Sequence, residues 1–226
     1  MMDRTRKPIA MRLLLAAALF QGAFAPGGDA LAASLIAMIT DRNGNALADA
    51  VVYALPVTGT SIPQRPPRSF AIEQVNREFV PFVTAVQTGT TINFPNRDAL
   101  LHHVYSFSPA KPFEIKLYSG EAPRGVLFDK PGTVTLGCNI HDWMLGYIHV
   151  VDTPYFAKSD TAGRASIPDI VSGEFEIHSW HPLQRATTPA KQVKLDQRVS
   201  AEVAFSVDIS PRRAKFKPPA NPIQYR

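Results

Sequence analysis

The chain has 226 residues, 45% of them hydrophobic and 19% charged, a balance typical of globular proteins that excludes a disordered or fibrous chain. Twenty prolines and 13 glycines argue against a helical bundle, and a single cysteine excludes a disulfide framework within the chain. The net charge of +5 is the sum of +2 on residues 1–32, −2 on residues 33–209 and +5 on residues 210–226, so the positive charge lies at the ends, which argues against a basic nucleic-acid-binding face.

The first 32 residues have the pattern of an export signal. Arg4 to Arg12 form a basic segment, and Leu13 to Phe20 form an apolar run that is too short to cross a bilayer. Ala30-Leu31-Ala32 fits the small-x-small rule for a cleavage site. We therefore expect residues 1–32 to be a signal peptide and the mature protein to be periplasmic, without stable membrane insertion.

The mature chain begins with two predicted strands. Residues 35–39 and 50–55 are rich in aliphatic residues, and the Asn43-Gly44 pair between them is a strong hairpin turn signal. We expect residues 50–55 to be the return strand of this hairpin. The proline-rich residues 63–68 are expected to be a linker or an extended segment.

A longer series of short strands is predicted from Phe70 to Val151. Apolar residues alternate with polar ones over seven or eight runs in about 85 residues, which favours a β-sandwich. Val134, Leu136 and Cys138 share one face of a predicted strand, because side chains alternate with period two.

The residues after Pro154 return to the pattern of the first segment. Residues 159–164 are a predicted turn, and residues 175–179 and 199–207 alternate as strands do. We expect an all-β protein that ends in a basic, proline-rich tail at residues 209–226.

The candidate metal ligands lie mostly in one short stretch. Cys138, His141 and Met144 follow one another as Cys-x-x-His-x-x-Met, and His102-His103 lies upstream at the start of another predicted strand. A sandwich can bring the two segments together. A thiolate, two imidazoles and a weak axial thioether are the ligands of a blue-copper electron-transfer site.

Residues from about Phe70 to Val151 resemble the cupredoxins, the group of plastocyanin, azurin and amicyanin. The cysteine loop matches the amicyanin spacing. The family's apolar-His-Asn-Val pattern is resembled by Leu101-His102-His103-Val104-Tyr105, and the family's approach to that histidine is resembled by Glu78 to Pro81 and Gln87 to Asp98. The chain also resembles exported bacterial proteins of the methylamine-utilisation type. The resemblance implies a Greek-key β-sandwich with one type 1 copper ion, held by His102, Cys138 and His141 in a plane and by Met144 axially.

His103 is a departure from the family pattern, which usually has Asn after the first histidine ligand. Its ring either braces the cysteine loop, as the family's Asn does, or competes with His102 for copper. We expect His102 to be the ligand and His103 to support it, because groups around a metal site commonly orient its ligands.

Two other chemistries, thiol hydrolysis and zinc binding, fit these residues less well. A thiol hydrolase would use Cys138 as nucleophile and His141 as base, but nothing resembles an oxyanion-hole loop. Zinc is a poorer match because Met is a poor zinc ligand. His178 and His181 lack a third donor and are expected to be structural, and His149 is expected at the surface or half-buried. For Trp143, packing and a docking surface both remain open.

The flanking segments resemble a carboxypeptidase-regulatory-like, transthyretin-type β-domain. The resemblance rests on residues 40–52 and on residues 159–164 and 170–177. We expect a cupredoxin domain at residues 62–152, inserted into a split β-module formed by residues 34–56 and 154–208.

The expected function is that of an exported copper protein, not an enzyme, which carries single electrons between a redox protein donor and acceptor. In the cupredoxin family, partners dock on an apolar surface around the loop histidine. Here that histidine is His141, and Leu100, Leu101, Trp143 and Leu145 are available for the surface. The alternatives are a periplasmic copper-binding or copper-delivery protein and a structural accessory module without redox function.

Overall fold

The structure, a computed structural model, describes residues 33–63, 66, 68–122, 124–196 and 200–210. These residues form strands and turns without any helix, which confirms the expected all-β class. The described part of the chain accordingly contains no helix that is long and apolar enough to cross a membrane. The expected signal peptide and residues 211–226 of the expected tail lie outside the described residues.

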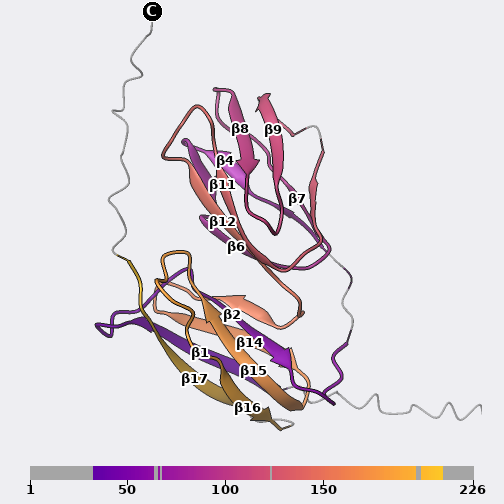
Figure 1. The fold of residues 1–226 in the computed structure, drawn as a ribbon, viewed down its shortest axis with the longest axis vertical. Helices are drawn as coiled ribbons and strands as arrows, with labels where there is room; N and C mark the ends of the chain where they lie inside the picture. Colours follow the sequence, from indigo (N-terminus) through magenta and orange to yellow (C-terminus); the bar gives the residue numbers. More distant parts are fainter. Residues whose placement is uncertain (1–32, 64–65, 67, 123, 197–199, 211–226) are drawn as a thin grey trace, which may run out of the picture. The chain divides into compact units, whose positions relative to one another are not determined.

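Strands from the beginning and the end of the described chain form two sheets around one core. Their strand orders are β14-β1-β17 and β13-β2-β15-β16, and β1 runs antiparallel to β14 and parallel to β17 (Figure 1). Within the described residues, neither β1 nor β2 pairs with a strand between residues 69 and 151. The strands are β1 (Ala33–Asp41), β2 (Val51–Pro56), β13 (Phe156–Lys158), β14 (Arg164–Ile170), β15 (Gly173–Trp180), β16 (Lys191–Leu195) and β17 (Ser200–Val207).

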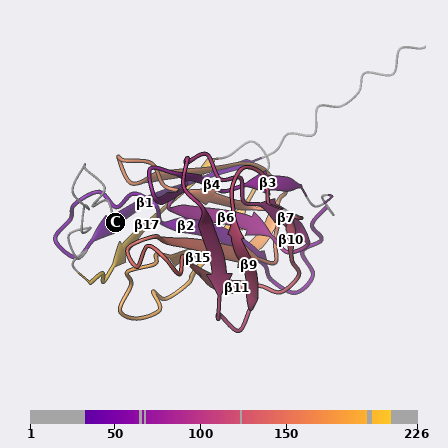
Figure 2. The ribbon, with the colours of Figure 1, turned by 90° about the horizontal axis from the view of Figure 1, so that it is seen from above.

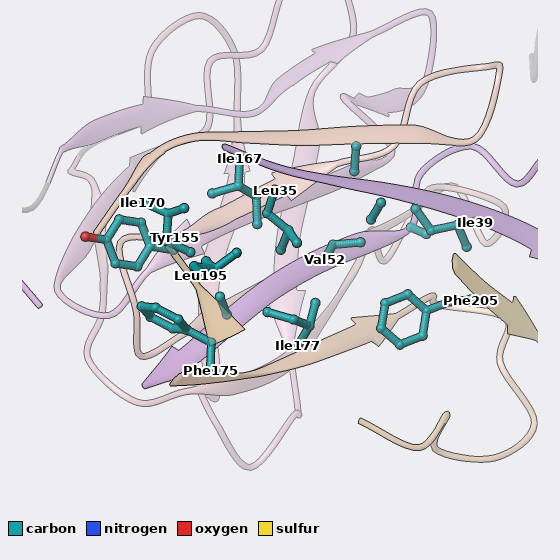
Figure 3. Close-up of a cluster of buried hydrophobic side chains, with 14 of the residues drawn as sticks. Leu35, Ile39, Val52, Tyr155, Ile167, Ile170, Phe175, Ile177, Leu195 and Phe205 are labelled. Atoms are coloured by element: carbon teal, nitrogen blue, oxygen red, sulfur yellow. The ribbon is translucent and has the colours of Figure 1, made fainter. Parts of the chain in front are cut away.

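The first core is built by the period-two alternation of these strands. Leu35 and Ile39 on β1 and Val52 on β2 are fully buried, and Figure 3 shows them among side chains from both sheets, including Ile177 and Phe205. Burying a side chain of this size contributes about 1.5–3 kcal/mol to the stability of the fold. Because the alternation gives each sheet one apolar face, the two sheets pack with these faces together.

The expected hairpin between residues 35–39 and 50–55 is wrong. The turn itself forms, because the Asp41 carboxylate accepts hydrogen bonds from the backbone N–H groups of Asn43 and Asn45 at 2.8 and 2.9 Å. After the turn, however, Leu47 and Ala50 are buried in the core, and the chain crosses to the other sheet. The Asn-Gly signal correctly predicted the turn but not the partner of the strand that follows.

Residues 69–151 form a second group of strands. A five-stranded sheet has the order β6-β12-β11-β8-β9, a three-stranded sheet has the order β10-β7-β3 (Figure 2), and β4 pairs with β5. The strands are β3 (Ser69–Ala71), β4 (Glu73–Val75), β5 (Glu78–Val80), β6 (Val83–Gln87), β7 (Thr90–Asn93), β8 (His102–Ser106), β9 (Phe113–Tyr118), β10 (Val126–Phe128), β11 (Gly132–Gly137) and β12 (Leu145–Val151).

The second core lies inside this group and contains residues from both of its larger sheets. Ile92 and Phe128 come from the three-stranded sheet, and Val104, Leu136 and Ile148 come from the five-stranded one. All five are fully buried, as the predicted alternation requires. Cys138 and Met144 belong to the same core, so the chemically distinctive residues are part of the packed interior.

His149 is buried, with 8% of its surface exposed, so the expectation of a surface or half-buried residue is wrong. It lies on the face of β12 that does not carry Ile148, and the ring of Trp180 stacks on it at 4.3 Å. Its Nδ1 lies 3.1 Å from the Thr133 hydroxyl. Burial lowers the pKa of His149 to about 4, because the charged ring loses its hydration there.

Two turns of the pattern Asp-x-x-Gly, at residues 41–44 and 160–163, give a first prediction. Gly44 and Gly163 both have positive φ angles, 83° and 75°. A Cβ on Gly163 would lie 2.3 Å from the Ile39 carbonyl oxygen, whereas a Cβ on Gly44 would have no atom within 4 Å. We expect Gly44→Ala to lower the free energy of unfolding by about 1–2 kcal/mol, from backbone strain alone. Gly163→Ala should lower the free energy of unfolding by clearly more, because the added Cβ also collides with the backbone. Urea unfolding of both variants tests this, and equal losses would contradict it.

The buried His149 predicts a loss of stability in acid. The folded protein buries the ring in its neutral form. The contribution of His149 to the free energy of unfolding is therefore complete above pH 6.5, the ordinary pKa, and is lost as the pH falls toward about 4. At pH 4.5 the loss from this ring should be about 2–3 kcal/mol. In urea unfolding of metal-free protein at pH 7 and 4.5, His149→Phe should therefore lose less stability than the wild type. A variant that loses as much would contradict this assignment.

Candidate metal centre

The candidate centre lies where β8 begins and β11 ends. The two strands pair antiparallel, with Gly137 opposite Tyr105, and this register brings Cys138 beside the start of β8. The Tyr105 ring packs closely on Gly137, because a Cβ at this position would lie 2.7 Å from the ring and would displace it. Local packing therefore holds together two segments that are 36 residues apart in the sequence.

Three donor atoms converge at this point. The Cys138 Sγ lies 4.0 Å from Nδ1 of His102 and 3.9 Å from Nδ1 of His141, and all three donors lie within 4.8 Å of one another. A point equidistant from atoms so spaced lies about 2.3–2.5 Å from each, close to the roughly 2.0–2.3 Å bonds that imidazole and thiolate form with a metal. The three side chains therefore fit a metal ion with little movement.

The cysteine loop folds back on itself through Met144. Its backbone N–H donates a hydrogen bond to the His141 carbonyl oxygen at 2.9 Å. Met144 is 2% exposed and belongs to the same core cluster as Cys138. The loop thus returns the thioether side chain to the interior that holds the thiol.

The two adjacent histidines face opposite sides of β8. His102 is fully buried and its ring lies 5.0 Å from the ring of His141, centre to centre. The ring of His103 turns away, and its Nε2 lies 2.9 Å from the Glu114 carboxylate on β9. Of the two, His102 belongs to the three-donor cluster. His103 reaches the cysteine through its backbone N–H rather than its ring.

The surroundings of Cys138 favour the thiolate. Burial raises the pKa of its thiol, but the hydrogen bond with His102 and the backbone N–H groups of His103, Ile140 and His141 lower it, and the net pKa lies below the usual value. A metal ligand must be deprotonated, so this environment reduces the cost of metal binding.

The two histidines of the cluster differ in their electrostatics. Burial lowers the pKa of His102, but Cys138 and Asp98 raise it, and the net shift is upward. Burial lowers the pKa of His141, and the charges of His102 and Arg77 lower it further. His141 is also the more exposed of the two rings. The rings therefore differ in access to solvent as well as in charge.

Asp98 is a residue of the site that the sequence reasoning missed. Its Oδ2 lies 2.7 Å from Nε2 of His102, and it is 15% exposed while the histidine is fully buried. The signal was present, since an acidic residue stands four positions before the expected ligand. In a loop this spacing predicts no contact. The contact arises because Asn96 folds the loop, donating to the backbone carbonyl oxygens of Leu100 and Tyr118.

His178 and His181 lie apart from the centre. His178 stacks on Tyr53 with ring centres 5.0 Å apart, and Nδ1 of His181 accepts a hydrogen bond from the Leu183 backbone. Within the described residues, the three-donor cluster of His102, Cys138 and His141 is the one group of its kind.

Apolar side chains next to the ligands in the sequence are exposed to solvent. Leu100 and Leu101 precede His102, Ile140 precedes His141, and Leu145 follows Met144. The four are between 41% and 50% exposed. Trp143 is half-buried, packs against the core and lies with its ring 5.3 Å from that of His141. Large apolar side chains left in solvent beside a functional site are typical of docking surfaces.

No protein-family model and no curated protein sequence matches the chain. Among solved structures, it is similar to a copper-containing nitrite reductase from Thermus scotoductus, with 25% identity, a TM-score of 0.36 and coverage of 44% of this chain. The chain spans only 26% of that reductase.

Two smaller proteins are also similar. A reduced amicyanin variant matches with 20% identity and a TM-score of 0.33, over 36% of this chain and 80% of its own. A purple cupredoxin from Nitrosopumilus maritimus matches with 20% identity and a TM-score of 0.33, over 36% and 98%. Each of these similarities covers less than half of the present chain.

The opposite orientations of His102 and His103 give a third prediction. We expect His102→Ala to weaken binding of a transition metal at least tenfold, because it removes one of three converging donors. His103→Asn should change binding less than threefold, because its ring faces Glu114. Equilibrium dialysis followed by metal analysis measures both. The assignment would be wrong if His103→Asn lost the metal and His102→Ala kept it.

Proposed function

We propose that the chain is an exported type 1 copper protein that carries single electrons between a redox protein donor and a redox protein acceptor in the periplasm. The observation that carries this proposal is a buried thiol whose sulfur lies within 4.0 Å of two imidazole nitrogens, in a core that also contains Met144. The leader-like pattern of residues 1–32 supports the export.

The donor set favours copper over other common metals. One thiolate, two imidazoles and a weak thioether form the trigonal set with a long axial ligand of blue-copper sites, whereas zinc sites take Cys, His and carboxylates. His102, Cys138 and His141 would hold the ion, and Met144 would supply the weak thioether. When bound there, copper supplies a reversible one-electron couple between its cuprous and cupric states.

The protein's own contribution is to hold these donors still. His102 begins β8, Cys138 directly follows β11, and both are buried in packed surroundings. A site whose donors keep their positions needs little reorganisation when its charge changes by one. The thiolate is held by backbone N–H groups and the His102 ring by Asp98.

The electron balance of the proposed cycle is simple. A reduced protein donor loses one electron, the site stores it, and an oxidised protein acceptor takes it, with no bond made or broken in either partner. The exposed Leu100, Leu101, Ile140 and Leu145 are suited to partner docking, and the half-buried His141 is the ligand nearest to solvent. A carrier of this kind is not an enzyme, since it transforms no substrate of its own.

A visible absorption spectrum tests the copper site. Cupric ion added to the purified mature protein should bind at one equivalent and give an intense thiolate-to-copper band. The band should be lost in Cys138→Ala, whereas Ser106→Ala, a substitution of a small buried residue on β8, should keep it. A colourless wild-type protein that takes up no stoichiometric copper would overturn the proposal.

Redox cycling separates an electron carrier from a copper-delivery protein. The loaded protein should be reduced and reoxidised rapidly over many cycles while the copper content, measured after gel filtration, stays at one per chain. Release of copper into a cuprous chelator at each reduction would contradict electron transfer and favour delivery.

A further inference from the structure

Asp98 accepts three hydrogen bonds at the junction of two loops. Its Oδ1 accepts from the backbone N–H of Asn76 at 2.7 Å, and its Oδ2 accepts from the backbone N–H of Arg77 at 2.9 Å. The same Oδ2 lies 2.7 Å from Nε2 of His102. Its own backbone N–H donates to the Asn96 side chain at 3.0 Å. The carboxylate therefore ties the turn between β4 and β5 to the histidine of the metal centre.

The bond to Asp98 decides which nitrogen of His102 carries the proton. A carboxylate only accepts hydrogen bonds, so the neutral imidazole must present an N–H at Nε2. Nδ1 is then left with its lone pair, and it is Nδ1 that points at Cys138, 4.0 Å from the sulfur. The arrangement of carboxylate, imidazole and donor site is the one in which outer groups fix the tautomer of a metal-binding histidine.

Asp98 also supplies a negative charge. It is 15% exposed and bonded to a ring with no exposure, so water screens the interaction less than at an open surface. A carboxylate at the far nitrogen of a ligand ring raises the basicity of that ring and stabilises the more positive state of the site. Removal of the charge should therefore shift the balance toward the reduced state.

We propose that Asp98 is a positioning residue that fixes His102 as the Nε2–H tautomer and biases the site toward the oxidised ion. This inference rests on the proposed copper site and deepens it. It assigns part of the control of the reduction potential to a loop residue that does not itself contact the metal. It also makes the β4–β5 turn part of the support of the site.

The first experiment needs no copper. In metal-free, full-length mature protein labelled with nitrogen-15, at a pH high enough for the His102 ring to be neutral, its ring nitrogens should show the Nε2–H tautomer, with an N–H proton in a strong hydrogen bond. Asp98→Asn keeps an oxygen as acceptor and should keep this tautomer. Asp98→Ala should give a mixture of tautomers. An Nδ1–H tautomer in the wild type would overturn the inference whether or not the protein binds copper.

The second experiment measures the reduction potential of the copper-loaded protein by redox titration. Asp98→Asn removes the charge but keeps one oxygen that can accept from His102, so we expect about a tenfold shift toward the cuprous state, which is a rise of about 59 mV for one electron. Asp98→Ala should in addition weaken copper binding 10- to 100-fold, the usual effect of losing an outer carboxylate.

Asn76→Ala is the matched control for an effect through the turn alone. Asn76 and Arg77 have φ angles of 55° and 60°, so alanine at position 76 strains the turn by roughly 1 kcal/mol while the Asp98 carboxylate and His102 remain. Its potential and His102 tautomer should match the wild type. An Asn76→Ala variant that reproduces the potential shift of Asp98→Asn would reduce Asp98 to a structural role and contradict the inference.

The two proposals can fail separately. If the wild type binds no copper, the proposed function fails, and the tautomer experiment still decides the first half of the inference. If the wild type gives the blue band but Asp98→Asn changes the equilibrium ratio of reduced to oxidised protein by less than twofold, the proposed function stands. The bias toward the oxidised state that is assigned to Asp98 is then wrong.

Discussion

The contact of a buried thiol with two imidazole nitrogens is the interaction on which the account of this protein depends. Cys138 has its sulfur 4.0 and 3.9 Å from Nδ1 of His102 and His141, with 3% of its surface exposed. Polar groups are rarely left so crowded in a core unless a ligand or a network satisfies them. The backbone N–H groups around the sulfur and the carboxylate of Asp98 form such a network in the protein alone, and a metal ion bound by the three donors would complete it.

The sheet makes this contact possible. Gly137 opposite Tyr105 fixes the register of β11 against β8, and a register shift by one residue would turn Cys138 away from the core. The same alternation places the rings of His102 and His103 on opposite faces, so only one of the adjacent histidines reaches the sulfur. The positions of the donors thus depend on strand pairing and core packing and not on the loop alone.

Alternation and ligand chemistry made part of the structure predictable from the sequence. The all-β class followed from short alternating runs, and the Cys-x-x-His-x-x-Met spacing singled out the loop, because both depend on local patterns. The absence of a hairpin between β1 and β2, the burial of His149 under Trp180 and the bond from Asp98 to His102 were not predictable. Each depends on which distant segments meet, and turn signals or spacing along the chain carry little information on that.

The most direct test of the central claim is X-ray absorption at the copper edge of the loaded mature protein. One sulfur scatterer at short distance and two imidazole nitrogens are expected in the oxidised state, with nearly the same distances after one-electron reduction. The short sulfur scatterer should disappear in Cys138→Ala. A copper environment made of nitrogen and oxygen alone in the wild type would contradict the claim.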